Sequence, residues 1–196
     1  MKYCIFGGSF DPPHEGHIHL ARSAVETFAM NLMLWVPSPQ PPHKDTPHTE
    51  FRHRLAMARL AALHLPNQAV SNVEEHLPRP NYSLDTIRAL KAEYGSEHQW
   101  HFLIGADNWA IFPTWHRHEE VLREVTLIVF PRQSYSIGDL SPGVMRLDLP
   151  EYPVASRDIR ETLAKPGGID SAPVPQEVLG YIQAHGLYGQ PVRRPM

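Results

Sequence analysis

Short apolar runs of strand length alternate along the chain with stretches of helical spacing, and this alternation is the feature that most constrains the fold. The helical stretches place apolar residues three or four positions apart, as at Ile18, Ala21 and Val25. Strands that are apolar at successive positions are typical of a parallel sheet covered by helices on both faces. We therefore predict an α/β fold with a doubly wound, mainly parallel sheet. The apolar runs lie at residues 3–6, 32–36, 69–73, 101–104, 126–130 and 145–149.

Length and composition indicate one globular unit that acts on small molecules. The 196 residues, 42% of them hydrophobic, predict a single domain over residues 1–196 with a small helical portion from about residue 154. A formal net charge of −3 gives no overall attraction to nucleic acid. The opening apolar run is too short for a signal segment or a membrane span. We expect a cytoplasmic protein with neither a nucleic acid nor a membrane partner, and the lone Cys4 excludes an internal disulfide.

Thirteen histidines raise the hypothesis of a metal-binding protein. They are scattered along the chain, however, and none falls into the spacing of a zinc protease or a zinc finger. We predict no metal site built from protein ligands alone.

The segment after the first apolar run combines small residues with two histidines three positions apart. From Gly7 to His17 it reads Gly-Gly-Ser-Phe-Asp-Pro-Pro-His-Glu-Gly-His, and a helical stretch begins near Gly16. Small residues let the backbone approach a ligand, and a helix N-terminus offers unpaired amides and the positive end of its dipole. His14 and His17 could then stabilise charge on a triphosphate as a nucleotidyl group moves. Taken residue by residue, a tight turn with a helix-capping histidine fits as well.

The whole string is more specific than its parts. It resembles the His-x-Gly-His signature, preceded by Gly-Gly-[Ser/Thr]-Phe-Asp-Pro, of the nucleotidyltransferase superfamily, which includes nicotinate mononucleotide and phosphopantetheine adenylyltransferases. The resemblance implies a Rossmann-like fold and makes His14 and His17 the catalytic pair that contacts the ATP phosphates. It also implies an ATP site lined by Gly7, Gly8, Ser9 and Phe10.

Further motifs follow in order along the chain: Pro41-Pro42-His43-Lys44, Arg52 to Arg59, Asn81-Tyr82-Ser83 with Thr86, Ile104-Gly105-Ala106-Asp107 with Trp115, and Val174-Pro175 to Leu187-Tyr188. Together they resemble the bacterial nicotinate mononucleotide adenylyltransferase family over essentially the full length. This resemblance implies transfer of AMP from ATP to nicotinate mononucleotide, which gives nicotinate adenine dinucleotide and pyrophosphate in NAD biosynthesis. ATP and nicotinate mononucleotide are then the expected partners, with Mg²⁺ carried by ATP.

The resemblance gives these residues roles, and a plainer interpretation stands beside several of them. Lys44 is implied to bind phosphate and assist catalysis, although an exposed loop lysine is usually only solvated. Asp107 could hydrogen-bond a ribose hydroxyl or help to hold Mg²⁺, or could be a helix N-cap. Trp115 could stack on a pyridine ring or belong to the core. The implied substrate-binding residues are Lys44, Tyr82, Ser83, Thr86, Gly105, Asp107, Thr114 and Trp115.

Two of these segments are implied to distinguish the acid from the amide. In the resembled family, backbone donors near Tyr82–Ser83 and near Thr114–Trp115 recognise the nicotinate carboxylate. From local sequence alone, Ser83 is most simply an N-cap of the helix that begins around Leu84.

Residues 154–160 resemble a second superfamily motif, Ile-Ser-Ser-[Ser/Thr]-x-Ile-Arg, in which a helix N-terminus and an arginine bind the β and γ phosphates. Ser156 and Arg160 match this motif, whereas Ala155 and Arg157 depart from it. The resemblance implies that Ser156, Arg157 and Arg160 bind ATP and that Arg160 is catalytic, with the extra guanidinium of Arg157 in place of a hydroxyl. A capped surface helix with Arg160 paired to acidic neighbours is the alternative.

Two other functions remain open at this point. A phosphopantetheine adenylyltransferase would share the first loop and the terminal arginine motif. A non-enzymatic nucleotide-binding module on the same fold would tolerate loss of one of the histidines, and both are present here. The sequence also leaves open a homo-oligomeric state and the strength of any preference for nicotinate over nicotinamide.

Overall fold

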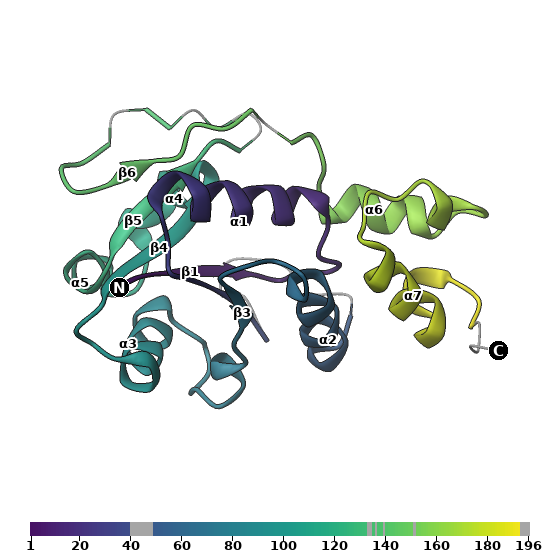
Figure 1. Cartoon of the computed structure of the whole chain (residues 1–196), viewed down its shortest axis with the longest axis horizontal. Coiled ribbons are helices and arrows are strands. Elements are labelled where there is room, and N and C mark those ends of the chain that lie inside the picture. Colours follow the sequence, from purple (N-terminus) through teal and green to yellow (C-terminus); the bar gives the residue numbers. More distant parts are fainter. Residues whose placement is uncertain (40–48, 133–134, 136, 139, 151, 193–196) are drawn as a thin grey trace.

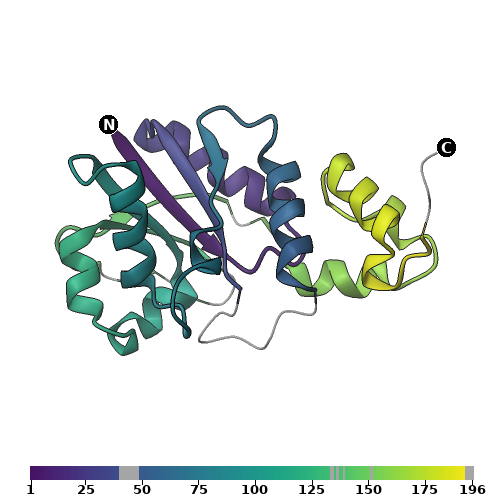
Figure 2. The same ribbon diagram turned by 90° about the horizontal axis from the view of Figure 1, so that it is seen from below.

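Six parallel strands form one sheet within the described residues, which are 1–39, 49–132, 135, 137–138, 140–150 and 152–192 of the computed structural model. The strands are β1 (Lys2–Gly8), β2 (Leu32–Pro37), β3 (Gln68–Val70), β4 (Gln99–Gly105), β5 (Thr126–Phe130) and β6 (Met145–Arg146). Their spatial order is β3-β2-β1-β4-β5-β6. Helices cover both faces of this sheet (Figures 1 and 2). The predicted Rossmann-like, doubly wound α/β fold is confirmed.

The helices connect the strands and continue beyond the last of them. The α-helices are α1 (Glu15–Phe28), α2 (Phe51–Ala62), α3 (Ser83–Tyr94), α4 (Ala106–Ile111), α5 (His118–Glu124), α6 (Ser156–Leu163) and α7 (Gln176–His185). Short 3-10 helices are η1 (Val73–Glu75), η2 (Phe112–Thr114), η3 (Gly168–Asp170) and η4 (Leu187–Gly189). No helix in the described part of the chain is long and apolar enough to cross a bilayer.

Successive residues of the central strands point to opposite faces of the sheet, and both faces are buried. Phe6 and Trp35 belong to a cluster with apolar residues of α1, α2, α6 and α7. Ile5 and Leu34, one position earlier in each strand, belong to a second cluster with residues of α3, α4 and α5. Burial on both sides explains why these strands are apolar at every position.

The third predicted strand, residues 69–73, ends earlier than expected. β3 stops at Val70, and Val73 begins η1. The backbone N–H of Val73 donates to the Ser71 hydroxyl over 3.2 Å, and this local bond turns the chain out of the sheet. The sixth strand is also shorter than the predicted run, at Met145–Arg146.

The topology opens a crevice at the carboxyl end of β1. β1 pairs with β2 on one side and with β4 on the other. The helix after β1 packs on one face of the sheet, whereas the helices after β4 pack on the opposite face. Such a switch point is where open α/β sheets bind ligands. At one end of the molecule α6 and α7 lie together, next to α2 (Figures 1 and 2).

Candidate active site

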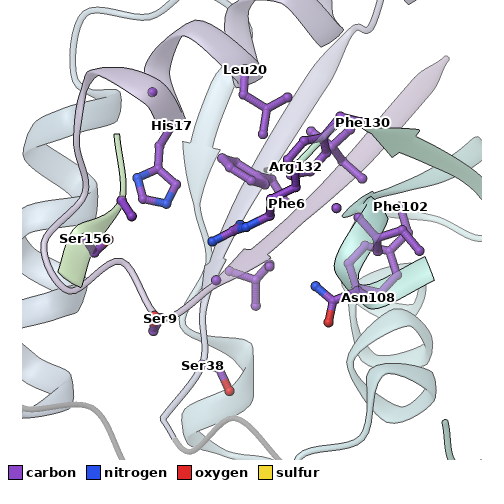
Figure 3. Close-up of a pocket in the computed structure, with 18 of the residues that line it drawn as sticks. Phe6, Ser9, His17, Leu20, Ser38, Phe102, Asn108, Phe130, Arg132 and Ser156 are labelled. Atoms are coloured by element: carbon purple, nitrogen blue, oxygen red, sulfur yellow. The ribbon is translucent and has the colours of Figure 1, made fainter. Parts of the chain in front are cut away.

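A cavity of about 360 Å³ lies at the carboxyl ends of β1, β4 and β5, within the size range of small-molecule sites. Its walls come from the loop between β1 and α1 (residues 9–14, the β1–α1 loop), from the beginnings of α3 and α6, and from the ends of β4 and β5. In Figure 3, His17 and Ser156 lie on one side of this cavity and Asn108 on the other. The cavity therefore brings together segments that lie far apart in the sequence.

The β1–α1 loop turns sharply directly after the sheet. Phe10 has a φ of 48°, a left-handed conformation that is uncommon outside glycine. Its ring packs across Gly8, where a Cβ atom would lie 3.0 Å from the ring, so a larger residue there would have to displace the ring. Gly7, Gly8 and Ser9 line the cavity as expected. Phe10, also expected to line the ATP site, is instead buried beneath the loop, where its ring contacts His17 at 5.1 Å between centroids.

The two histidines lie against each other where α1 begins. Their ring centroids are 3.7 Å apart, and both rings line the cavity. His14 is the N-cap residue of α1, and its backbone N–H donates to Nδ1 of His17 over 3.2 Å. Because this bond uses Nδ1 as an acceptor, a neutral His17 carries its proton on Nε2. The capping interpretation and the ligand-binding interpretation are thus compatible.

Burial sets the charge of His14. The residue is 6% exposed, and its Nδ1 has no hydrogen-bond partner among the described residues. Burial, followed by the nearby positive charge of Arg132, lowers the pKa of His14 from 6.5 to about 3. His14 is therefore neutral at physiological pH and offers a neutral N–H donor to a ligand.

Arg132 is a cation at the cavity that sequence reasoning did not single out. It follows β5 after one proline, and its Nε atom lies 3.6 Å from an Asp107 carboxylate oxygen. Figure 3 shows its side chain extending into the cavity between the histidine side and Asn108. An arginine placed directly beyond the carboxyl end of a buried strand was the signal that could have indicated it.

The beginning of α6 meets the β1–α1 loop. Ser156 is the first residue of α6, and its hydroxyl donates to the Pro12 carbonyl over 3.1 Å. Ser156 and Arg157 line the cavity. Arg160 lies behind them and donates through Nη1 to the Asp11 carbonyl over 2.7 Å. In this structure Arg160 binds the loop itself, and its contact with phosphate stays a prediction.

On the opposite side, Tyr82 and Ser83 line the cavity at the beginning of α3. Tyr82 is the N-cap residue and Ser83 the first helical residue, so the N-cap prediction for Ser83 was one position off. The Tyr82 ring stacks on His116, with centroids 4.2 Å apart. Thr86, predicted to bind substrate, is buried one turn further on, where its hydroxyl donates to a Glu74 carboxylate oxygen over 2.9 Å. Its position on the inner face of α3 directs the hydroxyl toward η1.

Glu74 is a second cavity residue that the motifs did not mark. Burial raises the pKa of Glu74, opposed by hydrogen bonds from Ser38 and Thr86. Its carbonyl accepts a hydrogen bond of 3.0 Å from the Asn81 side chain, which joins η1 to the segment before α3. One Glu74 carboxylate oxygen is buried without a partner among the described residues. No spacing rule in the sequence could have indicated this arrangement.

The remaining predicted residues lie at or near the end of β4. Gly105 and Trp115 line the cavity. The Trp115 ring also packs on Phe112, with ring centroids 5.3 Å apart, so Trp115 belongs both to the apolar core and to the cavity wall. Asp107 lies in the first turn of α4, with Gly105 as the N-cap, and pairs with Arg132. Thr114 is exposed and donates to the Ile111 carbonyl over 2.7 Å. Lys44, with the rest of its motif, lies outside the described residues.

Comparison with known proteins places the chain in a family. Residues 5–162 match the cytidylyltransferase-like family. A protein named "Probable nicotinate-nucleotide adenylyltransferase" from Solibacter usitatus is 41% identical to this chain, over 96% of this chain and 100% of its own length. A protein of the same name from Gloeobacter violaceus is 35% identical, over 95% of this chain and 96% of its own length.

A solved structure has the same fold. Nicotinic acid mononucleotide adenylyltransferase of Plasmodium falciparum in complex with NaAD superimposes with a TM-score of 0.79, over 98% of this chain and 99% of the other, at 19% identity. This agreement concerns the fold, whereas the bacterial relatives identify the family. By these matches, the chain belongs to the cytidylyltransferase-like family and, within it, to the nicotinate-nucleotide adenylyltransferases.

Proposed function

We propose that this protein transfers the adenylyl group of ATP to nicotinate mononucleotide, forming nicotinate adenine dinucleotide and releasing pyrophosphate in NAD biosynthesis. The observation that carries the proposal is the pair of imidazoles at the N-terminus of α1, whose ring centroids lie 3.7 Å apart. They line the same cavity as Tyr82, Ser83 and Trp115. The names of the bacterial relatives support the same activity and acceptor.

In the proposed reaction an oxygen of the acceptor 5′-phosphate attacks the α-phosphorus of ATP. The new P–O bond joins the two nucleotides as the bond to the β-phosphate oxygen breaks, and pyrophosphate leaves with that electron pair. No protein nucleophile is required, so the protein contributes positioning and stabilisation of developing charge. His14 and His17 donate N–H groups to phosphate oxygens, and Arg157, Arg160 and Lys44 supply positive charge.

The beginning of α3 suits the acceptor. Its first amides are unpaired within the helix and lie at the positive end of the helix dipole, so they favour a carboxylate. The half-buried Trp115 ring, which lines the cavity, offers a face for stacking on the pyridine. We assign recognition of the nicotinate carboxylate to the backbone at Tyr82–Ser83 and at Thr114–Trp115. A neutral amide offers less negative charge there, which favours the acid.

Magnesium is proposed to enter with ATP. The described residues contain no group of three histidine, cysteine or acidic side chains arranged to hold a metal ion. The ion's proposed contribution is to neutralise phosphate charge on the substrate itself.

The decisive substitution is His17→Ala. Loss of one donor to the developing charge should lower kcat by a factor on the order of 10² to 10³, measured as pyrophosphate released from ATP and nicotinate mononucleotide. His64→Ala is the control, because this exposed histidine pairs with Glu177 away from the cavity and should leave turnover unchanged. Nearly full turnover by His17→Ala at saturating substrates would refute the assignment.

A comparison of acceptors tests the substrate. We expect the wild-type protein to turn over nicotinate mononucleotide faster than its amide analogue and phosphopantetheine. Preference for phosphopantetheine would make the chain a phosphopantetheine adenylyltransferase. Binding of ATP without pyrophosphate release from any acceptor would indicate a regulatory module.

A further inference from the structure

We propose that Tyr188, close to the C-terminus, is a positioning residue for the ATP side of the site. Its hydroxyl holds the carboxylate of Asp11 and so fixes the β1–α1 loop that carries His14. The proposal rests on the proposed adenylyl transfer and assigns a role to the C-terminal Leu187-Tyr188 motif, which the reaction itself does not use.

The contact is short and joins distant parts of the chain. The Tyr188 hydroxyl donates to Oδ1 of Asp11 over 2.6 Å, although 177 positions separate the two residues. Asp11 is 2% exposed, so this carboxylate has little water to bind. Hydrogen bonds to an ionised, desolvated oxygen are about twice as strong as neutral ones.

The backbone at Tyr188 is left-handed, and in this conformation the Tyr188 hydroxyl reaches Asp11. Tyr188 lies in η4 with φ 55° and ψ 34°, between Gly186 and Gly189, which also have positive φ. A left-handed tyrosine is uncommon and is strained unless its surroundings hold it. Its hydrogen bond to Asp11 is an interaction that opposes this cost.

The C-terminal portion donates further hydrogen bonds to neighbouring residues of the β1–α1 loop. Beside the Tyr188 contact, Arg160 donates to the Asp11 carbonyl and Ser156 to the Pro12 carbonyl. Asp11 precedes His14 by three positions, and the backbone of His14 in turn holds the His17 ring. A shift of Asp11 therefore moves both proposed phosphate donors.

The Tyr188 hydroxyl stays protonated over the working pH range. Burial, and then the negative charge of Asp11, raises the pKa of Tyr188 well above its usual value, so the phenol remains a donor. The charged groups that face this pair are Arg54 and Arg160. Arg54 is buried and donates to the Ser9 carbonyl over 2.7 Å, and Asp11 opposes the lowering of its pKa by burial.

The test is Tyr188→Phe, which keeps the ring and removes the hydroxyl. We expect about a tenfold rise in KM for ATP together with a lower kcat, because one charge-assisted hydrogen bond is lost. The KM for nicotinate mononucleotide should not change, since Tyr82 and Trp115 belong to other elements. The effect should be the same at pH 7 and pH 9.

Tyr181→Phe is the matched control. This tyrosine lies on α7 in the same C-terminal portion, but its hydroxyl is 2.9 Å from Nδ1 of His53 on α2, not on the loop. It should leave both KM values unchanged. If Tyr188→Phe behaved like this control, or lowered the melting temperature and kcat while leaving both KM values as in the wild type, the positioning role would be wrong.

ATP binding measured directly by calorimetry separates this proposal from the proposed function. If the wild type binds ATP yet forms no dinucleotide, the proposed function fails. The positioning role is then still decided by whether Tyr188→Phe binds ATP about tenfold more weakly than Tyr181→Phe. Equal ATP affinity in the two variants would overturn it.

Discussion

The burial of His14 links the chemistry of the site to the stability of the protein. A buried imidazole with a pKa of about 3 is neutral when folded, whereas the same group in the unfolded chain titrates near 6.5. Because the folded-state pKa is lowered, protonation favours the unfolded chain. The contribution to stability is complete well above pH 6.5 and is lost as the pH falls below that value.

We predict that the wild type loses about 2 kcal/mol of unfolding free energy through His14 between pH 7.5 and pH 5. The His14→Asn variant lacks this titration. Its unfolding free energy should therefore fall by about 2 kcal/mol less than that of the wild type between pH 7.5 and pH 5. Urea denaturation of both proteins at the two pH values measures the difference. The lowered pKa values of His53 and His101 affect both proteins alike and cancel. An equal loss in the two proteins would show that His14 is not buried in its neutral form.

At the scale of elements, the turn from the β1–α1 loop into α1 leaves little space for a side chain at Gly16. A Cβ atom there would lie 3.0 Å from Nδ1 of His14, closer than most real contacts. Gly16 is already the second residue of α1, where alanine is the better helix former. The glycine therefore leaves room for the His14 ring at some cost in helix propensity.

Gly16→Ala should consequently lower kcat by at least about tenfold, because a displaced imidazole loses its alignment with the phosphate, while the melting temperature stays level or rises. Gly180→Ala in α7 is the counterpart, since a Cβ atom there meets nothing within 4 Å. It should stabilise the protein by about 0.5 to 1 kcal/mol and leave kcat unchanged. Full activity in Gly16→Ala would mean that the His14 ring has room to shift without cost.

Across the whole molecule, the C-terminal helices share the core of the sheet. Ile159 of α6 and Val178 of α7 belong to the same apolar cluster as Phe6 of β1 and Trp35 of β2. Their contacts with the β1–α1 loop and with α2 add polar links between the same parts. The expectation of a single domain over residues 1–196 stays a prediction, and this shared cluster is the reason to maintain it.

One cooperative domain predicts coincident unfolding curves. Three of the four tryptophans, Trp100, Trp109 and Trp115, belong to the apolar cluster that contains no residue of α6 or α7, so their fluorescence reports the sheet portion. Far-UV circular dichroism reports every helix, including α6 and α7. We expect one urea transition with the same midpoint by both methods. A loss of helical signal before the fluorescence change would show that the C-terminal portion unfolds separately.

The sequence by itself determined the six strands, their order along the chain and the longer helices between them, because burial leaves a pattern in these elements. The ends of β3 and β6 were not determined in this way. The sequence also located the β1–α1 loop, because glycines, a strand end and a helix beginning act through neighbours in the chain. The resemblance of the whole string to the superfamily signature then indicated His14 and His17 as the catalytic pair. The resemblance of the chain's motifs to a known family, rather than any local rule, indicated Gly105, Trp115 and Ser156, which line the cavity.

Only the tertiary structure decided which side chains meet. Burial of Thr86 against Glu74, attachment of Arg160 to the Asp11 carbonyl and the bond from Tyr188 to Asp11 all depend on how helices pack. The presence of Arg132 beside His14 has the same origin. A residue pattern states which face of an element is buried, but a contact near 3 Å between residues far apart in the chain depends on the position and orientation of whole elements, which no local rule contains.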